Sequence, residues 1–304
     1  MKRKDILGIK DLSRSEVNEL LSTADVMREM IDRGEKSNSL RGKTVATLFY
    51  ENSTRTRNSF ELAAKNLGAS TMSISVATSS VQKGETLVDT GKTLDALNTD
   101  VIIIRHSVAG SPQLLADTVK ASVINAGDGM NEHPSQALLD ALTAQRHFGS
   151  LVGKKAVIVG DVKHSRVARS DALLFSMLGA SVTVCAPYTL MPEGIDRFDC
   201  DVESDLDRAI VGADMVIALR MQLERMGQAY FSSKEEYNEY YGVTEKRLKL
   251  CSDDHIVMHP GPINRGAEID GCVADGNDSV ILEQVHNGVA VRMAMLQLLV
   301  GNAN

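Results

Sequence analysis

The sequence predicts an α/β protein with two domains, each containing a mostly parallel sheet flanked by helices. Short apolar runs rich in β-branched residues, typical of strands buried on both faces, alternate with stretches whose apolar residues recur at helical spacing. This alternation starts a second time after the loop Ser150–Gly153. In addition, 304 residues are many for a single hydrophobic core.

The composition is that of an ordinary globular protein, with 43% hydrophobic and 24% charged residues. The formal net charge of −7 argues against a general nucleic-acid binder, which would carry a basic face. No segment approaches the roughly 18 apolar residues of a membrane span, and no apolar signal segment follows the N-terminus. We expect a cytoplasmic protein with neither nucleic acid nor membrane as a partner.

The four cysteines give no sign of a metal site. The gaps between them are too long for the close pairing of zinc ligands, and inert thiols in a reducing compartment are the default interpretation. We therefore expect neither a metal nor any other cofactor. The cysteines are Cys185, Cys200, Cys251 and Cys272.

The first half of the chain begins with a predicted helix. Ser13-Arg14-Ser15-Glu16 is a capping box, and Gly34 ends the helix. The apolar run Val45–Tyr50 predicts a buried strand, and a second strand is expected near Ser70–Val76. Between these strands lies a predicted amphipathic helix that ends at Gly68.

The junction between the first strand and this helix is Ser53-Thr54-Arg55-Thr56-Arg57, called the basic turn below. Ser53 is predicted as the N-cap, which leaves the backbone N–H groups of the next three residues pointing out of the helix end. Such an end attracts anions, and helix stability alone would favour Asp or Glu there. The alternative is a capped helix with a solvated first turn. We interpret the turn as an oxyanion site, most simply for phosphate.

A third predicted strand, Asp100–Arg105, is continuous in β-branched residues and ends in an arginine. Ligands of open α/β sheets bind beyond the carboxyl ends of the strands. We therefore interpret Arg105 as a ligand contact, with a simple strand cap as the alternative.

A turn and a helix start are predicted at Asn125–Gln136. Two glycines make the turn, and Pro134 fits the first helical position, so His133 lies near the N-cap with Gln136 on the same side. A neutral imidazole there is suited to donate a hydrogen bond to a carbonyl. The alternative is a capping histidine beside a solvated glutamine.

The domain boundary is placed at the start of the helix that follows His133. We assign residues 1–134, together with a C-terminal helix of about 288–304, to the first domain and residues 135–287 to the second. A strand ending in Gly160-Asp161 opens the second half. No Gly-x-Gly-x-x-Gly follows it, so a nicotinamide-binding fold has weak support.

The second half repeats the placement of arginines seen in the first. A second basic turn, Lys163–Ser170, enters a helix, and the strand Asp214–Leu219 ends in Arg220. A further strand runs into a rigid proline- and glycine-containing turn at His259–Gly266. The last apolar stripe, Val289–Val300, predicts a helix that returns to the first domain.

The segment Ala77–Glu85 is predicted as a loop, and the polar and aromatic segment Gln228–Tyr241 is expected to be mobile. For Ala77–Glu85, a mobile surface loop and a lid that brings Lys83 to an anion remain alternatives.

The octapeptide Phe49–Thr56, Phe-Tyr-Glu-Asn-Ser-Thr-Arg-Thr, resembles the signature of the aspartate/ornithine carbamoyltransferase family, and further matches cover nearly the whole chain. The resemblance implies that the residues in contact with carbamoyl phosphate are Ser53, Thr54, Arg55, Thr56, Arg105, His133 and Gln136, with the backbone of Gly261 and Pro262. Among them it implies catalytic roles for Arg55, Thr56, Arg105 and His133. It implies that aspartate is bound by Lys83, Arg166, Arg220 and Gln222.

The resemblance also implies a homo-oligomer. In similar carbamoyltransferases the loop that matches Ala77–Glu85 reaches into the neighbouring subunit's site, where Ser79 and Lys83 would act. This implies a trimer with shared active sites and leaves a separate regulatory chain open.

The implied reaction is attack of the aspartate amine on the carbamoyl carbon, giving N-carbamoyl-L-aspartate and phosphate in de novo pyrimidine biosynthesis. The sequence contains no nucleophile motif that we can defend, so no covalent intermediate is expected. Arginine binds carboxylates in a bidentate way, so Arg166 and Arg220 favour an anionic acceptor.

Two alternatives stay open. One is a carbamoyltransferase that acts on ornithine or a modified ornithine, although that branch carries a cysteine in the loop matching His259–Pro262 and none occurs here. The other is a non-catalytic oligomeric subunit that binds anions.

Overall fold

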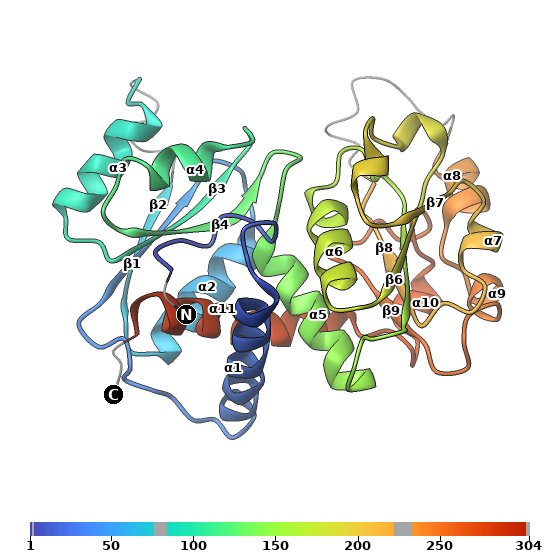
Figure 1. The fold of residues 1–304 in the computed structure, drawn as a ribbon, viewed down its shortest axis with the longest axis horizontal. Coiled ribbons are helices and arrows are strands. Elements are labelled where there is room, and N and C mark those ends of the chain that lie inside the picture. The colour runs from blue at the N-terminus through green and yellow to red at the C-terminus, as the bar shows by residue number, and fades with distance from the viewer. Residues whose placement is uncertain (2, 76–83, 222–232, 302–304) are drawn as a thin grey trace. The chain divides into compact units, whose positions relative to one another are not determined.

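The computed structural model describes residues 1, 3–75, 84–221 and 233–301 of the chain. The chain forms two compact units. Unit 1 comprises Met1–Leu142 and His286–Asn304, and unit 2 comprises Thr143–Val285. In each unit helices flank a parallel sheet (Figure 1), which confirms the predicted fold class.

Unit 1 is built on a four-stranded sheet with the order β2-β1-β3-β4, in which all neighbours are parallel. The chain passes from β1 to β2 at one edge and then crosses back to β3 and β4. The topological switch point, where open α/β sheets bind ligands, therefore lies between β1 and β3. The strands are β1 (Thr44–Phe49), β2 (Ser70–Ser75), β3 (Val101–His106) and β4 (Ser122–Asp128).

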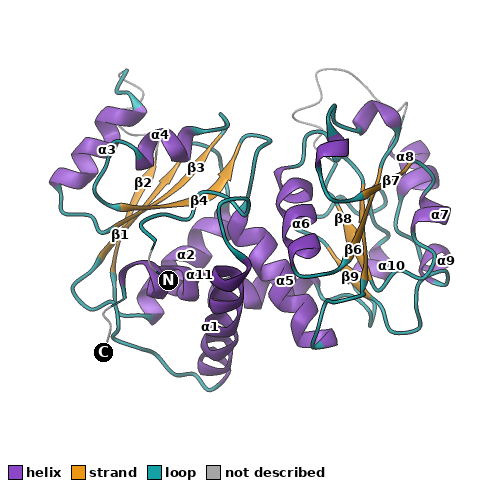
Figure 2. Ribbon diagram, viewed as in Figure 1, coloured by secondary structure: helices purple, strands orange, loops and turns teal. Residues whose placement is uncertain are grey.

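Helices cover both faces of this sheet (Figure 2). Successive side chains of a strand point to opposite faces, and Ala46 and Leu48 of β1 form a core with Leu94 of α3 and Leu115 of α4. The helix α2 packs against β1 and β2 and buries Phe60 completely. The helices of unit 1, with the two that cross its boundary, are α1 (Arg14–Asp32), α2 (Thr54–Asn66), α3 (Leu87–Ala96), α4 (Ser111–Ala116), α5 (Pro134–Phe148) and α11 (Ile281–Val300).

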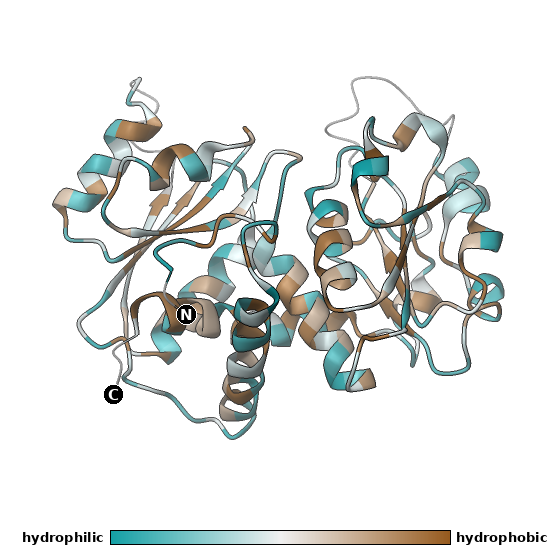
Figure 3. Cartoon of the chain, in the orientation of Figure 1, coloured by the Kyte–Doolittle hydropathy of each residue, from teal (hydrophilic) through white to brown (hydrophobic). Residues whose placement is uncertain are grey.

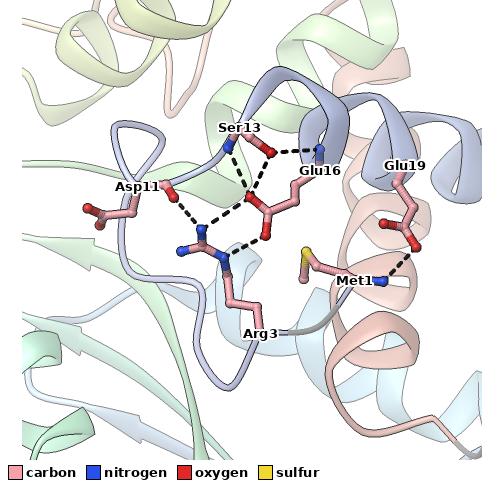
Figure 4. Close-up of polar contacts among 6 residues, drawn as sticks. All are labelled: Met1, Arg3, Asp11, Ser13, Glu16 and Glu19. Carbon is pink, nitrogen blue, oxygen red and sulfur yellow. Dashed lines mark hydrogen bonds and ion pairs between the residues drawn. The ribbon is translucent and has the colours of Figure 1, made fainter.

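The N-terminal segment is fastened to the start of α1 (Figure 4). The predicted capping box is confirmed, because the Ser13 hydroxyl accepts from the Glu16 N–H and the Glu16 carboxylate accepts from the Ser13 N–H. Arg3 donates to both carboxylate oxygens of Glu16, at 3.0 and 3.1 Å, and to the carbonyl oxygen of Asp11. The hydrogen bond from Arg3 is the main reason why the pKa of Glu16 falls to about 2.

Unit 2 contains a five-stranded parallel sheet with the order β7-β6-β5-β8-β9. The chain moves outward from β5 to β7 and then returns to the other side of β5 at β8. The switch point of this sheet therefore lies between β5 and β8. The strands are β5 (Lys155–Val159), β6 (Ser181–Cys185), β7 (Asp201–Glu203), β8 (Met215–Ala218) and β9 (Ile256–Met258).

Hydrophobic residues gather along the strands and on the sheet-facing sides of the helices (Figure 3). In unit 2, Val157, Val216 and Val257 of three adjacent strands share one core with Ile210 and Val273. The helices of unit 2 are α6 (Arg166–Met177), α7 (Leu206–Ala209), α8 (Lys234–Tyr241), α9 (Glu245–Leu248) and α10 (Gly271–Ala274), with 3-10 turns η3 (Tyr188–Leu190) and η4 (Ile195–Arg197).

The helix α8 lies in the segment Gln228–Tyr241, for which no helix was predicted. Its residues Lys234–Tyr241 are helical, while the earlier part of that segment up to residue 232 lies outside the described residues. Ser233 caps α8 by accepting a hydrogen bond from the Glu236 N–H at 3.1 Å. Tyr237 is fully buried and anchors the helix in the unit.

The last helix, α11, packs in unit 1, which confirms the predicted return of the C-terminal helix. Asn66 of α2 lies 3.9 Å from the sulfur of Met293, and the guanidinium carbon of Arg292 lies 5.0 Å from the ring centroid of Phe60. None of the helices in the described ranges is long and apolar enough to cross a membrane.

Both divisions between the units fall inside continuous helices. One lies between Leu142 and Thr143 of α5, and the other between Val285 and His286 of α11. The divisions predicted from the sequence lie at residues 134 and 287. No loop marks a crossing that runs through an uninterrupted helix, so its position leaves little local signal in the sequence.

Candidate active site

The basic turn lies between β1 and α2, as expected. Ser53 occupies the N-cap position, and its carbonyl accepts from the Arg57 N–H at 3.1 Å, but its hydroxyl makes no capping hydrogen bond. Thr54 and Arg55 are exposed, whereas Thr56 is buried. The first turn of α2 contains no acidic residue. The arginines therefore add to the partial positive charge of the helix end.

Arg105 lies near the carboxyl end of β3, opposite a bulge in β4. Two residues of β4, Ala126 and Gly127, face it because the register shifts there. Gly127 has φ 113°, a backbone conformation that glycine adopts readily. The Arg105 Nη1 lies 3.5 Å from the carbonyl oxygen of Ala126, and its Nε lies 3.4 Å from Oε2 of Glu51. The guanidinium is thus held by a carbonyl of β4 and by a carboxylate from the segment that follows β1.

Arg105 and the basic turn belong to the same edge of the sheet. Phe49, the last residue of β1, pairs directly with Arg105, and the Tyr50 N–H donates to the Arg105 carbonyl at 2.8 Å. The basic turn begins soon after Tyr50. Both arginine-bearing elements therefore flank the switch point of unit 1.

His133 and Gln136 lie at the start of α5. The His133 carbonyl accepts from the N–H groups of Gln136 and Ala137 at 2.9 and 3.2 Å, so His133 has the predicted cap position. Its Nδ1 lies 3.4 Å from the Ser135 hydroxyl. His133 is 4% exposed and Gln136 is 8% exposed, which excludes the solvated glutamine considered as an alternative.

A buried carboxylate fixes the connection between β4 and α5. Asp128 accepts from Nδ2 of Asn125 at 2.8 Å and from the N–H groups of Gly110 and Glu132 at 2.8 and 3.2 Å. Such donors offset the cost of burying a charge. The strand β4 extends to Asp128, so residues 125–128, which were expected in a turn, are strand. Sequence reasoning missed the role of this carboxylate.

The second basic turn opens α6, directly after β5. Arg166 is the first residue of α6 and is 4% exposed. Ser165 caps the helix by accepting from the Ala168 N–H at 3.1 Å. The buried carboxylate of Asp161 accepts from the His164 N–H at 3.2 Å and lies 2.8 Å from its Nδ1. The turn that leads into Arg166 is therefore closed by a carboxylate.

Arg220 lies two residues after the end of β8. The strands β5 and β8 are neighbours, with Val159 opposite Ala218, and the Leu219 N–H donates to the Val159 carbonyl at 2.8 Å. Arg166 and Arg220 therefore flank the switch point of unit 2, in the same way as the arginines of unit 1 flank theirs.

The turn after β9 is held by a buried histidine–glutamate pair. His259 Nδ1 accepts from the Gly261 N–H at 2.7 Å, so its Nε2 carries the proton and lies 3.1 Å from Oε1 of Glu268. The same oxygen accepts from the Asn264 N–H at 2.6 Å. These contacts fix the backbone around Gly261 and Pro262, which are joined by a cis peptide bond.

Three residues singled out from the sequence, Ser79, Lys83 and Gln222, lie outside the described residues. Within the ranges that the structure describes, no three His, Cys, Asp or Glu side chains come together as metal ligands. Sequence reasoning missed the carboxylates that support the site, such as Glu51 and Glu268. The only feature of the sequence that could have indicated these carboxylates is that they lie close to the motifs they support.

The chain matches two family models. One, described as aspartate/ornithine carbamoyltransferase, carbamoyl-P binding domain, covers residues 4–146. The other, described as aspartate/ornithine carbamoyltransferase, Asp/Orn binding domain, covers residues 152–299.

Similar proteins cover nearly the whole chain. The aspartate carbamoyltransferase catalytic subunit of Ruminiclostridium cellulolyticum is 53% identical over 98% of this chain and 96% of its own. That of Moorella thermoacetica is 54% identical over 100% and 99%. Aspartate transcarbamoylase from Trypanosoma cruzi, solved in complex with carbamoyl phosphate and aspartate, has a TM-score of 0.86 at 31% identity, covering 96% of this chain and 94% of its own. Ornithine carbamoyltransferase from Pyrococcus furiosus has a TM-score of 0.88 at 28% identity, covering 99% and 98%.

We predict that Glu268→Ala destabilises the protein by about 3 kcal/mol, because it leaves a buried histidine N–H and a backbone N–H without their acceptor. Thermal unfolding should show a fall of several degrees, and Glu268→Gln, which keeps one acceptor oxygen, should lose less. Asp275→Ala is the matched control, since it breaks the exposed ion pair with Arg265 in the same segment and should change little. Equal melting temperatures for Glu268→Ala and Asp275→Ala would contradict a structural role for the buried pair.

Proposed function

This chain belongs to the aspartate/ornithine carbamoyltransferase family, and we propose that it transfers the carbamoyl group of carbamoyl phosphate to the amine of L-aspartate. The products are N-carbamoyl-L-aspartate and phosphate, which assigns the enzyme to de novo pyrimidine biosynthesis.

One observation carries the proposal. Each unit presents two arginines at the switch point of its sheet, Arg55 and Arg105 in unit 1 and Arg166 and Arg220 in unit 2. Both reactants are anions, one a phosphate and the other a dicarboxylate. Arginine's planar fork matches the oxygen atoms of both groups. A single phosphate would not require four such side chains.

In this proposal unit 1 binds carbamoyl phosphate and unit 2 binds aspartate. The residues proposed for carbamoyl phosphate are Ser53, Thr54, Arg55, Thr56, Arg105, His133 and Gln136, together with the backbone of Gly261 and Pro262. Those proposed for aspartate are Lys83, Arg166, Arg220 and Gln222.

The chemistry follows from the charges that develop. The aspartate amine attacks the carbamoyl carbon, a C–N bond forms, and the C–O bond to phosphate breaks. Negative charge grows first on the carbonyl oxygen and then on the leaving phosphate, where Thr56, Arg105 and His133 would stabilise it. The amine loses one proton, which the leaving phosphate dianion can accept. Holding both reactants at once supplies proximity.

The acceptor is decided by side chains rather than by the fold, because both aspartate and ornithine enzymes share this architecture. A dicarboxylate suits Arg166 and Arg220, whereas the cationic side chain of ornithine would be repelled by them. The relatives at 51–54% identity are aspartate carbamoyltransferase catalytic subunits, which supports the same acceptor.

The function is tested by incubating the purified protein with carbamoyl phosphate and a panel of aspartate, ornithine, N-acetylornithine and N-succinylornithine, followed by an assay for ureido product. Among the four acceptors we expect product only with aspartate, because only in aspartate does the reacting amine lie within a few bonds of two carboxylates that arginines can hold. Product with ornithine but not with aspartate would show that the acceptor is ornithine and would contradict the proposal. If no acceptor gives product, the alternative of a non-catalytic subunit that binds anions would be favoured.

Arg55→Ala should lower kcat on the order of 100-fold or more, because it removes one preorganised donor from the phosphate. Lys65→Ala is the matched control, since it removes a positive charge from the exposed far end of the same helix and should leave kcat near that of the unaltered protein. Initial rates of ureido formation measure both variants. Near-normal turnover by Arg55→Ala would remove the basic turn from the mechanism.

We further propose a cytoplasmic homotrimer in which Ser79 and Lys83 of a neighbouring copy complete each site. The proposal rests on the family resemblance of the segment Ala77–Glu85. Whether a regulatory chain also binds is a separate question that this proposal does not require.

If the active sites are shared between subunits, two variants of low activity should restore activity when they are mixed. When Lys83→Ala and Arg55→Ala proteins are mixed under conditions that exchange subunits, some sites should combine an intact Lys83 with an intact Arg55, and activity should return. Each variant mixed with itself is the control. A mixture no more active than the two separate proteins would argue against sharing.

A further inference from the structure

The side-chain amide of Gln136 has a fixed orientation. Its Nε2 lies 3.0 and 3.2 Å from the two carboxylate oxygens of Asp140, one turn further along α5. Both side chains are buried, and Asp140 is fully inaccessible. An ionised carboxylate only accepts hydrogen bonds, so the reversed amide would set its oxygen against two others at a buried site.

This orientation decides what Gln136 can recognise. With Nε2 directed at Asp140, the amide oxygen Oε1 is presented on the opposite side of the group, where it acts as an acceptor. Carbamoyl phosphate carries an amide NH₂, whereas acyl phosphates such as acetyl phosphate carry a methyl group in its place. A buried acceptor therefore binds a ligand with an N–H donor more tightly than one with a methyl group, because the methyl group leaves the acceptor without a hydrogen bond.

We propose that Asp140 is a positioning residue: it orients the Gln136 amide so that Oε1 accepts a hydrogen bond from the carbamoyl NH₂ group. In this proposal Arg292 is a buried counter-cation for Asp140. The inference rests on the proposed function, in which Gln136 contacts the carbamoyl group. It adds a reason why the donor must be a carbamoyl rather than an acyl phosphate.

The surroundings of Arg292 explain its role. The side chain comes from α11 and is 4% exposed, its Nη1 donates to the Gly288 carbonyl at 2.8 Å, and its guanidinium lies over the Phe60 ring. A Cβ at residue 288 would stand 2.5 Å from Nη1, so in this side-chain position the guanidinium packs directly against Gly288.

Electrostatics link Arg292 to both sides of the proposed donor site. Burial lowers the pKa of Arg292 to about 10, the charge of Asp140 acts against this, and the charge of Arg55 adds to it. The guanidinium therefore remains a cation at neutral pH. The positive charge of Arg292 and the negative charge of Asp140 therefore partly offset each other inside unit 1.

The test compares two stable ligands that differ in one group, phosphonoacetamide with an NH₂ and acetonylphosphonate with a CH₃. Their Kd values, measured by isothermal titration calorimetry, give a preference that does not depend on turnover. We expect the unaltered protein to prefer phosphonoacetamide by about 10-fold or more. In Asp140→Asn, whose amide no longer dictates the orientation of Gln136, this preference should fall to about 2-fold or less.

A purely structural role for Asp140 would weaken both ligands equally and leave the preference intact, which would overturn the proposal. No preference in the unaltered protein would overturn it as well. Asp117→Asn is the matched control, because it alters the exposed pair between Gln113 and Asp117, which has the same spacing on α4. It should leave both Kd values unchanged.

A double-variant cycle tests whether Asp140 acts through Gln136. In a Gln136→Ala background, Asp140→Asn should change the preference by less than about 2-fold, because the group it positions is gone. A full further loss in the double variant would overturn the link between the two residues.

Arg292 provides a second route should Asp140→Asn fail to fold. Arg292→Lys keeps the buried charge and should retain most of the preference, whereas Arg292→Gln should lose it in the same direction as Asp140→Asn. Equal preference in both Arg292 variants would contradict its role as counter-cation. The ureido assay of the unaltered protein separates these outcomes from a failure of the proposed function.

Discussion

Positive charge concentrated at the carboxyl edges of two parallel sheets is the constraint on which the rest of this structure depends. Arg55 stands at a helix end that already carries partial positive charge and has no acidic residue in its first turn. Arg105 lies near the carboxyl end of β3, the strand next to the one that leads into this helix. In unit 2, Arg166 and Arg220 repeat the arrangement. Stability alone would favour acidic residues at such helix ends, so the arrangement makes physical sense as a pair of anion sites.

Groups placed in this way need a rigid support, which buried carboxylates provide. Asp128 closes the connection into α5, Asp161 closes the turn before α6, and Glu268 holds the turn after β9. Each accepts backbone N–H donors, and this offsets the cost of its burial. Because each carboxylate binds backbone N–H groups as well as a side chain, it fixes the path of the chain. The path of the chain in turn sets the direction of the neighbouring arginine or histidine.

Much of the fold could be predicted because its signals are local. The capping box at Ser13–Glu16 and the strand ending in Arg105 are patterns of a few consecutive residues. The bulge opposite Arg105 could not be predicted, because it depends on register between two strands. The helix α8 was missed because its sequence is polar, and its stability comes from a cap and one buried tyrosine. Ser53 shows the opposite case, in which the predicted position is right but the hydroxyl makes no cap.

The return of the C-terminal helix gives the site something that the local motifs cannot. Gln136 and Asp140 are four residues apart, and at the exposed start of a helix such a pair would be an ordinary solvated contact. Here both are buried, and Arg292 from the far end of the chain is also buried in unit 1, where it packs on Phe60 of α2. Unit 1 thereby contains a buried amide, a buried anion and a buried cation. Recognition of phosphate can be read from the basic turn alone, but discrimination between an amide and a methyl group requires this buried arrangement, which exists only when residues 286–301 pack in the first unit.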